Sequence, residues 1–309
     1  MKKFLKYILL LVLFAYILPA ILAFSLPSNP NGYYKGYALK YNRLDTMNGP
    51  RLLIFGGSEI ALAINTQLLQ DSLKMNVANL GLHAGLGMDL NLNDALKYSR
   101  NGDIVLFSFS TFLGAGHGEG NVFDIPFFIN YYPKKYVELS SYNKRTVIYG
   151  VYPLLKGKLH YLYSRWVGKD RQSYALRSFD GNGDFMKPDS TSYMYPGKGK
   201  VDSVDYISDN IAYLNSVADR LNAIKDKGCI VYIIPSVRHQ LRYQSDRLAV
   251  GRLAEFMKER GIEQLFDAKE SAVPNELLYD NPCHTNNEGA VFYSNLIVKH
   301  LNPVLSAQQ

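Results

Sequence analysis

Short, uninterrupted apolar runs alternate along this chain with longer segments whose apolar residues have helical spacing. The runs predict five buried strands, at residues 51–55 (RLLIF), 76–80 (NVANL), 103–109 (DIVLFSF), 229–234 (CIVYII) and 262–266. The segments with helical spacing lie at residues 60–69, 88–100, 206–227, 248–260 and 286–301. Strands and helices that alternate in this way form a parallel sheet with helices on both faces, so we expect an α/β fold.

The alternation is interrupted once, which suggests how the domain is organised. Between residues 111 and 205 the chain is irregular, with glycine-rich and polar stretches around one expected helix at 142–166. Residues 25–50 are rich in Pro, Gly, Asn and Tyr and predict a linker, and residues 302–309 predict a tail. We therefore expect a single α/β domain at residues 51–301 that carries an insertion.

The N-terminus combines a basic start with a long apolar run. Three lysines among the first six residues precede an uncharged run at residues 7–24. This pattern is typical of an export signal, and the run is just long enough to span a bilayer. We expect residues 1–24 to be an uncleaved signal anchor, a transmembrane helix, with cleavage after residues 21–23 as the alternative. The lysines stay in the cytoplasm, which places the domain on the periplasmic side of an inner membrane or at the cell surface.

The composition argues against one broad class of partner. The formal net charge is +7, and three of these charges belong to the N-terminal lysines. No dense run of Lys and Arg follows, so we expect no nucleic-acid partner, because such binding needs a clustered basic face. The 24 tyrosines, against one tryptophan, suit half-buried packing or stacking on sugars.

The two cysteines indicate neither a disulfide nor a metal site. Cys229 begins an expected buried strand, and Cys283 lies in a loop near the C-terminus. In the expected sheet these positions fall at opposite ends, too far apart for a disulfide. No Cys and His residues have the spacing of a zinc site, so we expect no metal and no other cofactor.

A glycine pair and a serine follow the first expected strand, in the sequence Phe55-Gly56-Gly57-Ser58-Glu59. Glycines permit a tight turn that other residues resist. A serine at the start of a helix lies where the helix dipole favours developing negative charge. Ser58 is therefore a candidate nucleophile, with a structural helix cap as the alternative.

The second motif, Asp280-Asn281-Pro282-Cys283-His284, lies just before the last expected helix. A serine nucleophile needs a base, and the base needs a group that holds its tautomer. Asp280 and His284 on one stiff loop could supply both, or could belong to an ordinary surface loop. The following residues, Thr285 to Glu288, predict a capping box at the start of the helix.

Together these two motifs resemble the SGNH or GDSL hydrolases, over residues 51–301. The resemblance implies a flavodoxin-like parallel sheet with Ser58 as nucleophile, His284 as base and Asp280 as acid. The sequence Asn79-Leu80-Gly81 resembles the second block of the family. This implies an oxyanion hole formed by the backbone N–H groups of Ser58 and Gly81.

The chain departs from the family pattern in two places. The family spaces its acid and base as Asp-x-x-His, whereas this chain has one residue more. The family also ends its third strand with an asparagine that donates to the oxyanion, and residues 107–111 (FSFST) contain none. Losing one such donor costs about 10²–10³ in rate. Ser110, Asn79 and His83 are candidates to replace it.

Other residues at expected strand ends are candidates for substrate binding. Arg238 and His239 follow the fourth strand, where they could bind an acidic or sugar group, and His83 follows the second. Asp184 ends a segment with a counterpart in divergent envelope relatives of the family, an aromatic–Asn/Asp–x–x–Gly–Asp motif. It is expected either to line the pocket or to turn the chain.

These features lead to two alternative expectations for function. The first is a serine esterase or O-acyl (acetyl) transferase acting on an acylated envelope or exported glycan. A transferase would also require a membrane protein that donates the acyl group. The second is an inactive SGNH-like envelope protein that binds a glycan or an assembly partner, and the missing asparagine favours this second view.

Overall fold

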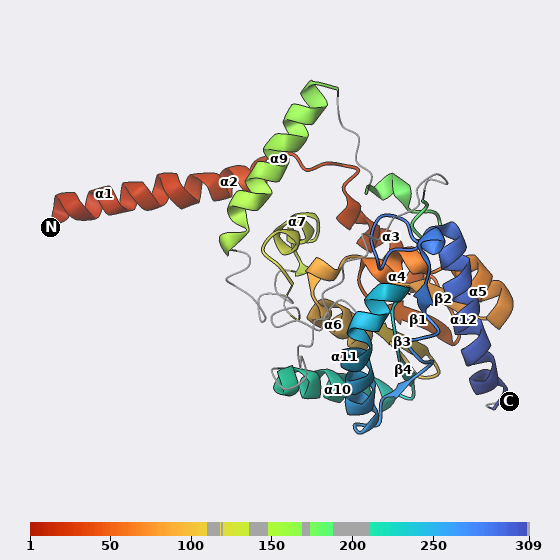
Figure 1. Cartoon of the computed structure of the whole chain (residues 1–309). Helices are drawn as coiled ribbons and strands as arrows, with labels where there is room; N and C mark the ends of the chain where they lie inside the picture. The colour runs from red at the N-terminus through yellow and green to blue at the C-terminus, as the bar shows by residue number, and fades with distance from the viewer. Residues whose placement is uncertain (110–117, 119, 136–147, 169–173, 188–209, 308–309) are drawn as a thin grey trace.

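The computed structural model describes residues 1–109, 118, 120–135, 148–168, 174–187 and 210–307. Within this part of the chain a five-stranded sheet lies at the centre (Figure 1). Its strands are β1 (Arg51–Phe55), β2 (Asn76–Asn79), β3 (Ile104–Ser108), β4 (Ile230–Ile234) and β6 (Glu263–Gln264). They lie in the order β2-β1-β3-β4-β6, and every neighbouring pair is parallel. The α/β fold expected from the alternating pattern is confirmed.

Helices cover both faces of the sheet because successive side chains of each strand enter opposite apolar cores. In β1, Leu53 and Phe55 belong to one core, whereas Leu52 and Ile54 belong to the other. The first core is covered by α3 (Gly36–Asp45), α6 (Met88–Tyr98), α10 (Ile211–Lys225) and α11 (Gln240–Lys258), and the second by α5 (Thr66–Leu73) and α12 (Asn287–Ser306). Burial on both faces explains why β1 and β3 are continuous apolar runs. The fifth strand, expected to be buried at residues 262–266, is only the edge pair Glu263–Gln264, and Glu263 is exposed.

Several helix boundaries differ from the expected ones. The segment 60–69 divides into α4 (Ser58–Ala63) and α5, because the Asn65 side chain accepts from the Leu68 N–H and begins a new helix. Helix α12 continues through the expected tail to Ser306. Its N-cap is Asn286, so the capping box predicted at Thr285 is wrong.

The expected linker at residues 25–50 is part of the core instead. It contains α3, and its buried residues Tyr33, Tyr37, Tyr41 and Leu44 all pack in the first core. Their spacing of three to four residues is helical, but tyrosines among Gly and Asn made the segment look polar. The linker prediction is therefore wrong for this segment.

The insertion between β3 and α10 is described in part and is anchored to the sheet by one carboxylate. Its described helices include α7 (Asp124–Tyr131) and α9 (Val151–Trp166). In residues 174–187, Asp184 accepts hydrogen bonds from the Thr66 N–H and hydroxyl at 2.6 and 2.7 Å, and from the Asn79 amide at 3.0 Å. These bonds hold the insertion against the end of β2.

An apolar helical segment precedes the domain and projects from it (Figure 1). It comprises α1 (Lys2–Val12), a π-helical turn (Leu13–Ile17) and α2 (Leu18–Ser25). An 18-residue stretch within these 24 residues has a mean hydropathy of 2.7, and the segment is long and apolar enough to cross a membrane.

Asp184→Ala should lower the free energy of unfolding by about 2–4 kcal/mol, because it leaves buried donors of Thr66 and Asn79 unpaired. Urea denaturation followed by circular dichroism measures this loss. Asp226→Ala, which removes an exposed carboxylate at the end of α10, is the matched control, and we expect a change within about 0.5 kcal/mol. Equal stability of the two variants would contradict an anchoring role for Asp184.

Candidate active site

Ser58 is presented at the carboxyl end of β1 by a turn that only glycine fits. A Cβ on Gly56 would lie 2.4 Å from the Ile60 side chain, and one on Gly57 would lie 2.5 Å from that of Glu59. Neither glycine has a positive φ. Glycine is therefore explained at these two positions by the close approach of neighbouring side chains, not by a backbone conformation that other residues avoid. Gly57 is the N-cap residue, and Ser58 is the first residue of α4.

The loop that carries Asp280 and His284 is closed by one hydrogen bond and is joined to the rest of the domain by two others. The Tyr279 N–H donates to the His284 carbonyl at 2.9 Å and closes the loop. The N–H of His239, in the short strand β5 (Arg238–His239), donates to the Pro282 carbonyl at 2.8 Å. The Thr285 hydroxyl donates to the Leu62 carbonyl of α4 at 2.6 Å, which joins the loop to the helix that carries Ser58.

Ser58, His284 and Asp280 form a hydrogen-bonded chain. His284 Nε2 lies 2.9 Å from Ser58 Oγ, and His284 Nδ1 lies 2.7 Å from Asp280 Oδ1. An ionised carboxylate only accepts hydrogen bonds, so we assign the ring proton to Nδ1. The lone pair of Nε2 then faces the serine hydroxyl. This is the arrangement in which an imidazole can take a proton from a nucleophile.

Tyr174, from the insertion, completes the surroundings of the acid and the base. Its hydroxyl donates to Asp280 Oδ2 and lies 3.2 Å from His284 Nδ1. Partial burial alone would raise the pKa of the Asp280 carboxyl, but the hydrogen bonds from His284 and Tyr174 outweigh it and hold that pKa below its usual range. Burial and the same carboxylate raise the pKa of Tyr174, so Tyr174 remains a donor.

The Ser58 hydroxyl opens into a cavity of about 420 Å³, within the usual size range of small-molecule sites. Residues from five separate parts of the chain line it: Tyr33, Tyr34, Ser58, His83, Tyr174, Asp280, Asn281 and His284. Burial raises the pKa of both Tyr33 and Tyr34, which keeps these phenols neutral. The cavity thus combines aromatic walls with the Ser58 hydroxyl, which is hydrogen-bonded to His284.

Among the predicted substrate-binding residues that the structure describes, only His83 lines this cavity. Its Nδ1 accepts from the Gly85 N–H at 3.1 Å, which leaves the proton on Nε2. Burial lowers the pKa of the imidazole, although Asp124 opposes the shift. A neutral His83 can therefore donate a hydrogen bond from Nε2.

The predicted oxyanion donor Gly81 is not available. Its N–H donates to the Asn79 side chain at 3.2 Å. A Cβ on Gly81 would lie 2.6 Å from the Ala61 nitrogen, so this glycine is needed for packing against α4. The prediction for Gly81 is wrong in this structure, because the turn after β2 directs its N–H back to its own strand end.

Three further candidates for substrate binding lie away from the lining of the cavity, and a fourth is not described. Arg238 pairs with Asp246, and His239 Nδ1 accepts from the Leu241 N–H to cap α11. Asp184 holds the insertion, as shown above. Ser110 lies outside the described residues. Strand ends placed these residues near the site, but local hydrogen bonds determine where their side chains point.

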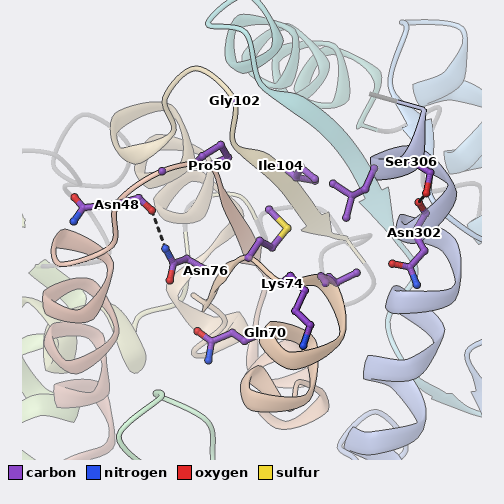
Figure 2. Close-up of a pocket in the computed structure, with 13 residues that line it drawn as sticks. Asn48, Pro50, Gln70, Lys74, Asn76, Gly102, Ile104, Asn302 and Ser306 are labelled. Atoms are coloured by element: carbon purple, nitrogen blue, oxygen red, sulfur yellow. Dashed lines mark hydrogen bonds between the residues drawn. The ribbon is translucent and has the colours of Figure 1, made fainter. Parts of the chain in front are cut away.

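A larger hollow of about 950 Å³ lies at the opposite end of the sheet (Figure 2). Its wall includes Pro50 and Gly102, which precede β1 and β3, and Asn302 and Ser306 from the end of α12. Among its lining residues only Lys74 carries a charged side chain, and none provides a nucleophile with a base. In parallel sheets reactive sites lie beyond the carboxyl ends, so the smaller Ser58 cavity is the candidate site.

Three tyrosines and one asparagine of the site lie where the sequence predicted no site residue. Tyr33 and Tyr34 belong to the segment expected to be a linker, and Tyr174 belongs to the irregular insertion. The excess of tyrosine was a signal, but it did not show which residues gather at the site. Asn281, which lines the cavity, directly follows Asp280 and could have been included with it.

Tyr174→Phe should slow the labelling of Ser58 by a fluorophosphonate, most strongly at acidic pH. The hydroxyl stabilises the ionised form of Asp280, so its removal raises the pKa of Asp280. As pH falls, Asp280 is then protonated sooner, and the acid limb of the labelling profile moves to higher pH. Tyr279→Phe is the control and should keep the original profile. An unchanged profile for Tyr174→Phe would refute this role.

No protein-family model matches the sequence, and no curated protein matches it either. Both cysteines are free. In the residues that the structure describes, no group of three or more His, Cys, Asp or Glu side chains could hold a metal ion. What the site can do therefore follows from its own geometry.

Proposed function

We propose that this chain is a serine esterase or O-acyltransferase that uses Ser58, His284 and Asp280. The observation that carries this proposal is the continuous chain of hydrogen bonds from Ser58 Oγ through His284 to Asp280. These residues lie 226 and 4 positions apart in the sequence, so only a specific fold brings them together. The aromatic cavity beside Ser58 gives an ester substrate access to the nucleophile.

The strand order supports membership of the SGNH or GDSL hydrolases. The order β2-β1-β3-β4-β6 corresponds to the 2-1-3-4-5 order of flavodoxin-like sheets, with β6 as the fifth strand. Ser58 follows the first strand of the sheet, and Asp280 and His284 precede the last helix, as in that family. The extra residue in the Asp-x-x-x-His spacing is accommodated, because Asp280 and His284 are in direct hydrogen-bond contact.

The reaction would proceed by acyl transfer to the serine. Ser58 Oγ attacks the ester carbonyl while His284 Nε2 takes the hydroxyl proton, and Asp280 stabilises the resulting imidazolium. The C–O bond to the leaving alcohol then breaks, and His284 returns the proton to that alcohol. Water or a sugar hydroxyl, deprotonated by His284, releases the acyl group from Ser58.

We propose the backbone N–H groups of Ser58 and Ala84 as oxyanion donors, in place of the pair that includes Gly81. Ala84 begins the one-turn helix η3 (Ala84–Leu86), where backbone N–H groups have no partner within the helix. Its nitrogen would lie 3.0 Å from a Cβ on Gly57, so it is next to the turn that presents Ser58. His83 Nε2 is a further donor at the same cavity.

An exported glycan is the substrate class that the surroundings favour. The apolar N-terminal helix with its cytoplasmic lysines would place the domain outside the cytoplasm. Three tyrosines line the cavity, and aromatic rings stack well on the apolar faces of sugars. If the enzyme is a transferase, a membrane protein that supplies the acyl group is its expected partner.

A non-catalytic glycan-binding protein is the second candidate. Two observations favour it: no asparagine follows Phe107 before Thr111, and the Gly81 N–H is occupied by Asn79. Such a protein would keep the hydrogen-bonded residues without turning over an ester. The experiments below separate the two candidates.

The first test treats the full-length protein, in detergent or nanodiscs, with a fluorophosphonate probe. Wild type should be labelled, and Ser58→Ala and His284→Ala should each abolish labelling, because the probe reacts with an activated serine. Ser164→Ala is the matched control: Ser164 Oγ also contacts a histidine ring, that of His160, at 3.4 Å, but on an exposed helix. Folded wild type that never labels would favour the binding protein.

The second test, Ala84→Pro, removes one backbone N–H while all site side chains remain. Proline is tolerated at the first position of a helix, and the preceding residue His83 already has extended backbone angles. We expect the rate of ester hydrolysis or of probe labelling to fall by about 10²–10³. Ala84→Ser, which retains the N–H, should stay near wild type. Equal rates for the two variants would refute the assignment of Ala84.

A further inference from the structure

Helix α9 packs along the apolar N-terminal segment rather than on the α/β core (Figure 1). Ala23, Val151 and Leu154 form a buried cluster that is separate from both cores of the sheet. Partly buried apolar residues complete it: Tyr16, Ala20, Phe127 and Leu155. The position of α9 is therefore tied to that of the N-terminal helix.

Three hydrogen bonds show how the two helices are aligned. The Tyr152 hydroxyl donates to the Ala15 carbonyl, and the Tyr16 hydroxyl donates to the Ile148 carbonyl just before α9 at 3.2 Å. Further along, the Lys158 ammonium donates to the Leu26 carbonyl at 2.6 Å. Residues 148 and 152 thus contact residues 15 and 16 of the N-terminal segment, and residue 158 contacts residue 26. The two helices therefore run in the same direction.

This alignment places the beginning of α9 at bilayer depth if the N-terminal helix spans the membrane, as the proposed function assumes. Ala15 lies ten residues before Ser25, which is about 15 Å along a helix. A hydrocarbon core is about 30 Å thick. Tyr152, beside Ala15, would then lie near the middle of the hydrocarbon core.

The exposed face of α9 has the chemistry that such a position requires. Tyr152, Lys156, Leu159, Tyr163 and Trp166 follow one another at helical spacing, and all are exposed. Trp166 is 83% exposed and Leu159 52%, which is costly for a helix that faces water. On the opposite face, Val151, Leu154, Lys158 and Tyr161 are buried.

The distribution of charge on α9 also matches a lipid surface. The helix carries Lys156 and Arg165 at exposed positions and contains no acidic residue. Basic side chains are attracted to lipid phosphates, and a lysine can extend its ammonium toward the headgroups from slightly below them. Trp166 and Tyr163, at the end that leaves the bilayer, are the residue types that collect at membrane interfaces.

We propose that α9 is a second membrane contact, with its first turns inserted in the outer leaflet and its Tyr163–Trp166 end among the headgroups. A hollow behind α9, lined in part by Gly157, Lys158 and Tyr161, shares Tyr33, Tyr34 and Tyr174 with the Ser58 cavity. Insertion of α9 would therefore hold the Ser58 site beside the membrane surface. This inference rests on the proposed membrane span, but not on catalysis.

The test measures tryptophan quenching by brominated lipid in the full-length protein, reconstituted in nanodiscs of phosphatidylcholine and phosphatidylglycerol. Trp166 is the only tryptophan in the chain, so Trp166→Phe gives a silent background. In this background, Tyr152→Trp reports on α9, Ile21→Trp on the N-terminal helix, and Leu248→Trp on an exposed position of α11. With bromines deep in the acyl chains, we expect the first two to be quenched at least several-fold more than Leu248→Trp.

Each other outcome overturns the proposal in a distinguishable way. Quenching of Ile21→Trp alone would show that α9 stays outside the bilayer. If neither Tyr152→Trp nor Ile21→Trp is quenched, the proposed membrane span itself is wrong. A shielded tryptophan in Tyr152→Trp, together with a doubled protein mass per nanodisc, would assign this face to a second copy of the chain. Fluorophosphonate labelling of the same samples measures the proposed catalysis separately.

Discussion

The buried hydrogen bond from the Thr285 hydroxyl to the Leu62 carbonyl joins two segments that lie 223 residues apart in the sequence. One segment is the helix that begins with Ser58, and the other is the loop that carries Asp280 and His284. Both bonded groups are inaccessible to water, so separating them would leave a buried donor and acceptor unpaired. The connection holds Ser58 Oγ and His284 Nε2 at their distance of 2.9 Å. Proton transfer between two such atoms fails when their distance grows by about an ångström.

The insertion serves the same site from the outside. Residues 174–187 contribute Tyr174, which contacts Asp280 and His284, and Asp184, which binds the end of β2 through Asn79. A carboxylate that anchors the insertion thus lies ten residues from a hydroxyl that donates to Asp280. Through Tyr33 and Tyr34 the site also borders the hollow behind α9, so the N-terminal helix, the insertion and the sheet form one continuous set of contacts.

The sequence predicted the sheet because every central strand is buried on both faces, and such strands appear as apolar runs of four to six residues. It predicted Ser58, Asp280 and His284 because strand ends in a parallel sheet converge on one edge. The predictions from sequence were wrong where a residue had two possible hydrogen-bond partners. Thr285 was expected to cap α12 but bonds to Leu62, and the Gly81 N–H was expected at the oxyanion but bonds to Asn79.

What the sequence by itself determined was the order of strands and helices, the apolar N-terminal segment and the chemical identity of the three aligned site residues. These follow from periodicity and from local motifs, which act over a few neighbouring positions. Only the tertiary structure decided that Tyr33, Tyr34 and Tyr174 surround Ser58, and that Asp184, Arg238 and His239 support the fold instead of lining the cavity. Those outcomes depend on side-chain hydrogen bonds between segments that are distant in the chain, and the sequence pattern contains no record of such pairings.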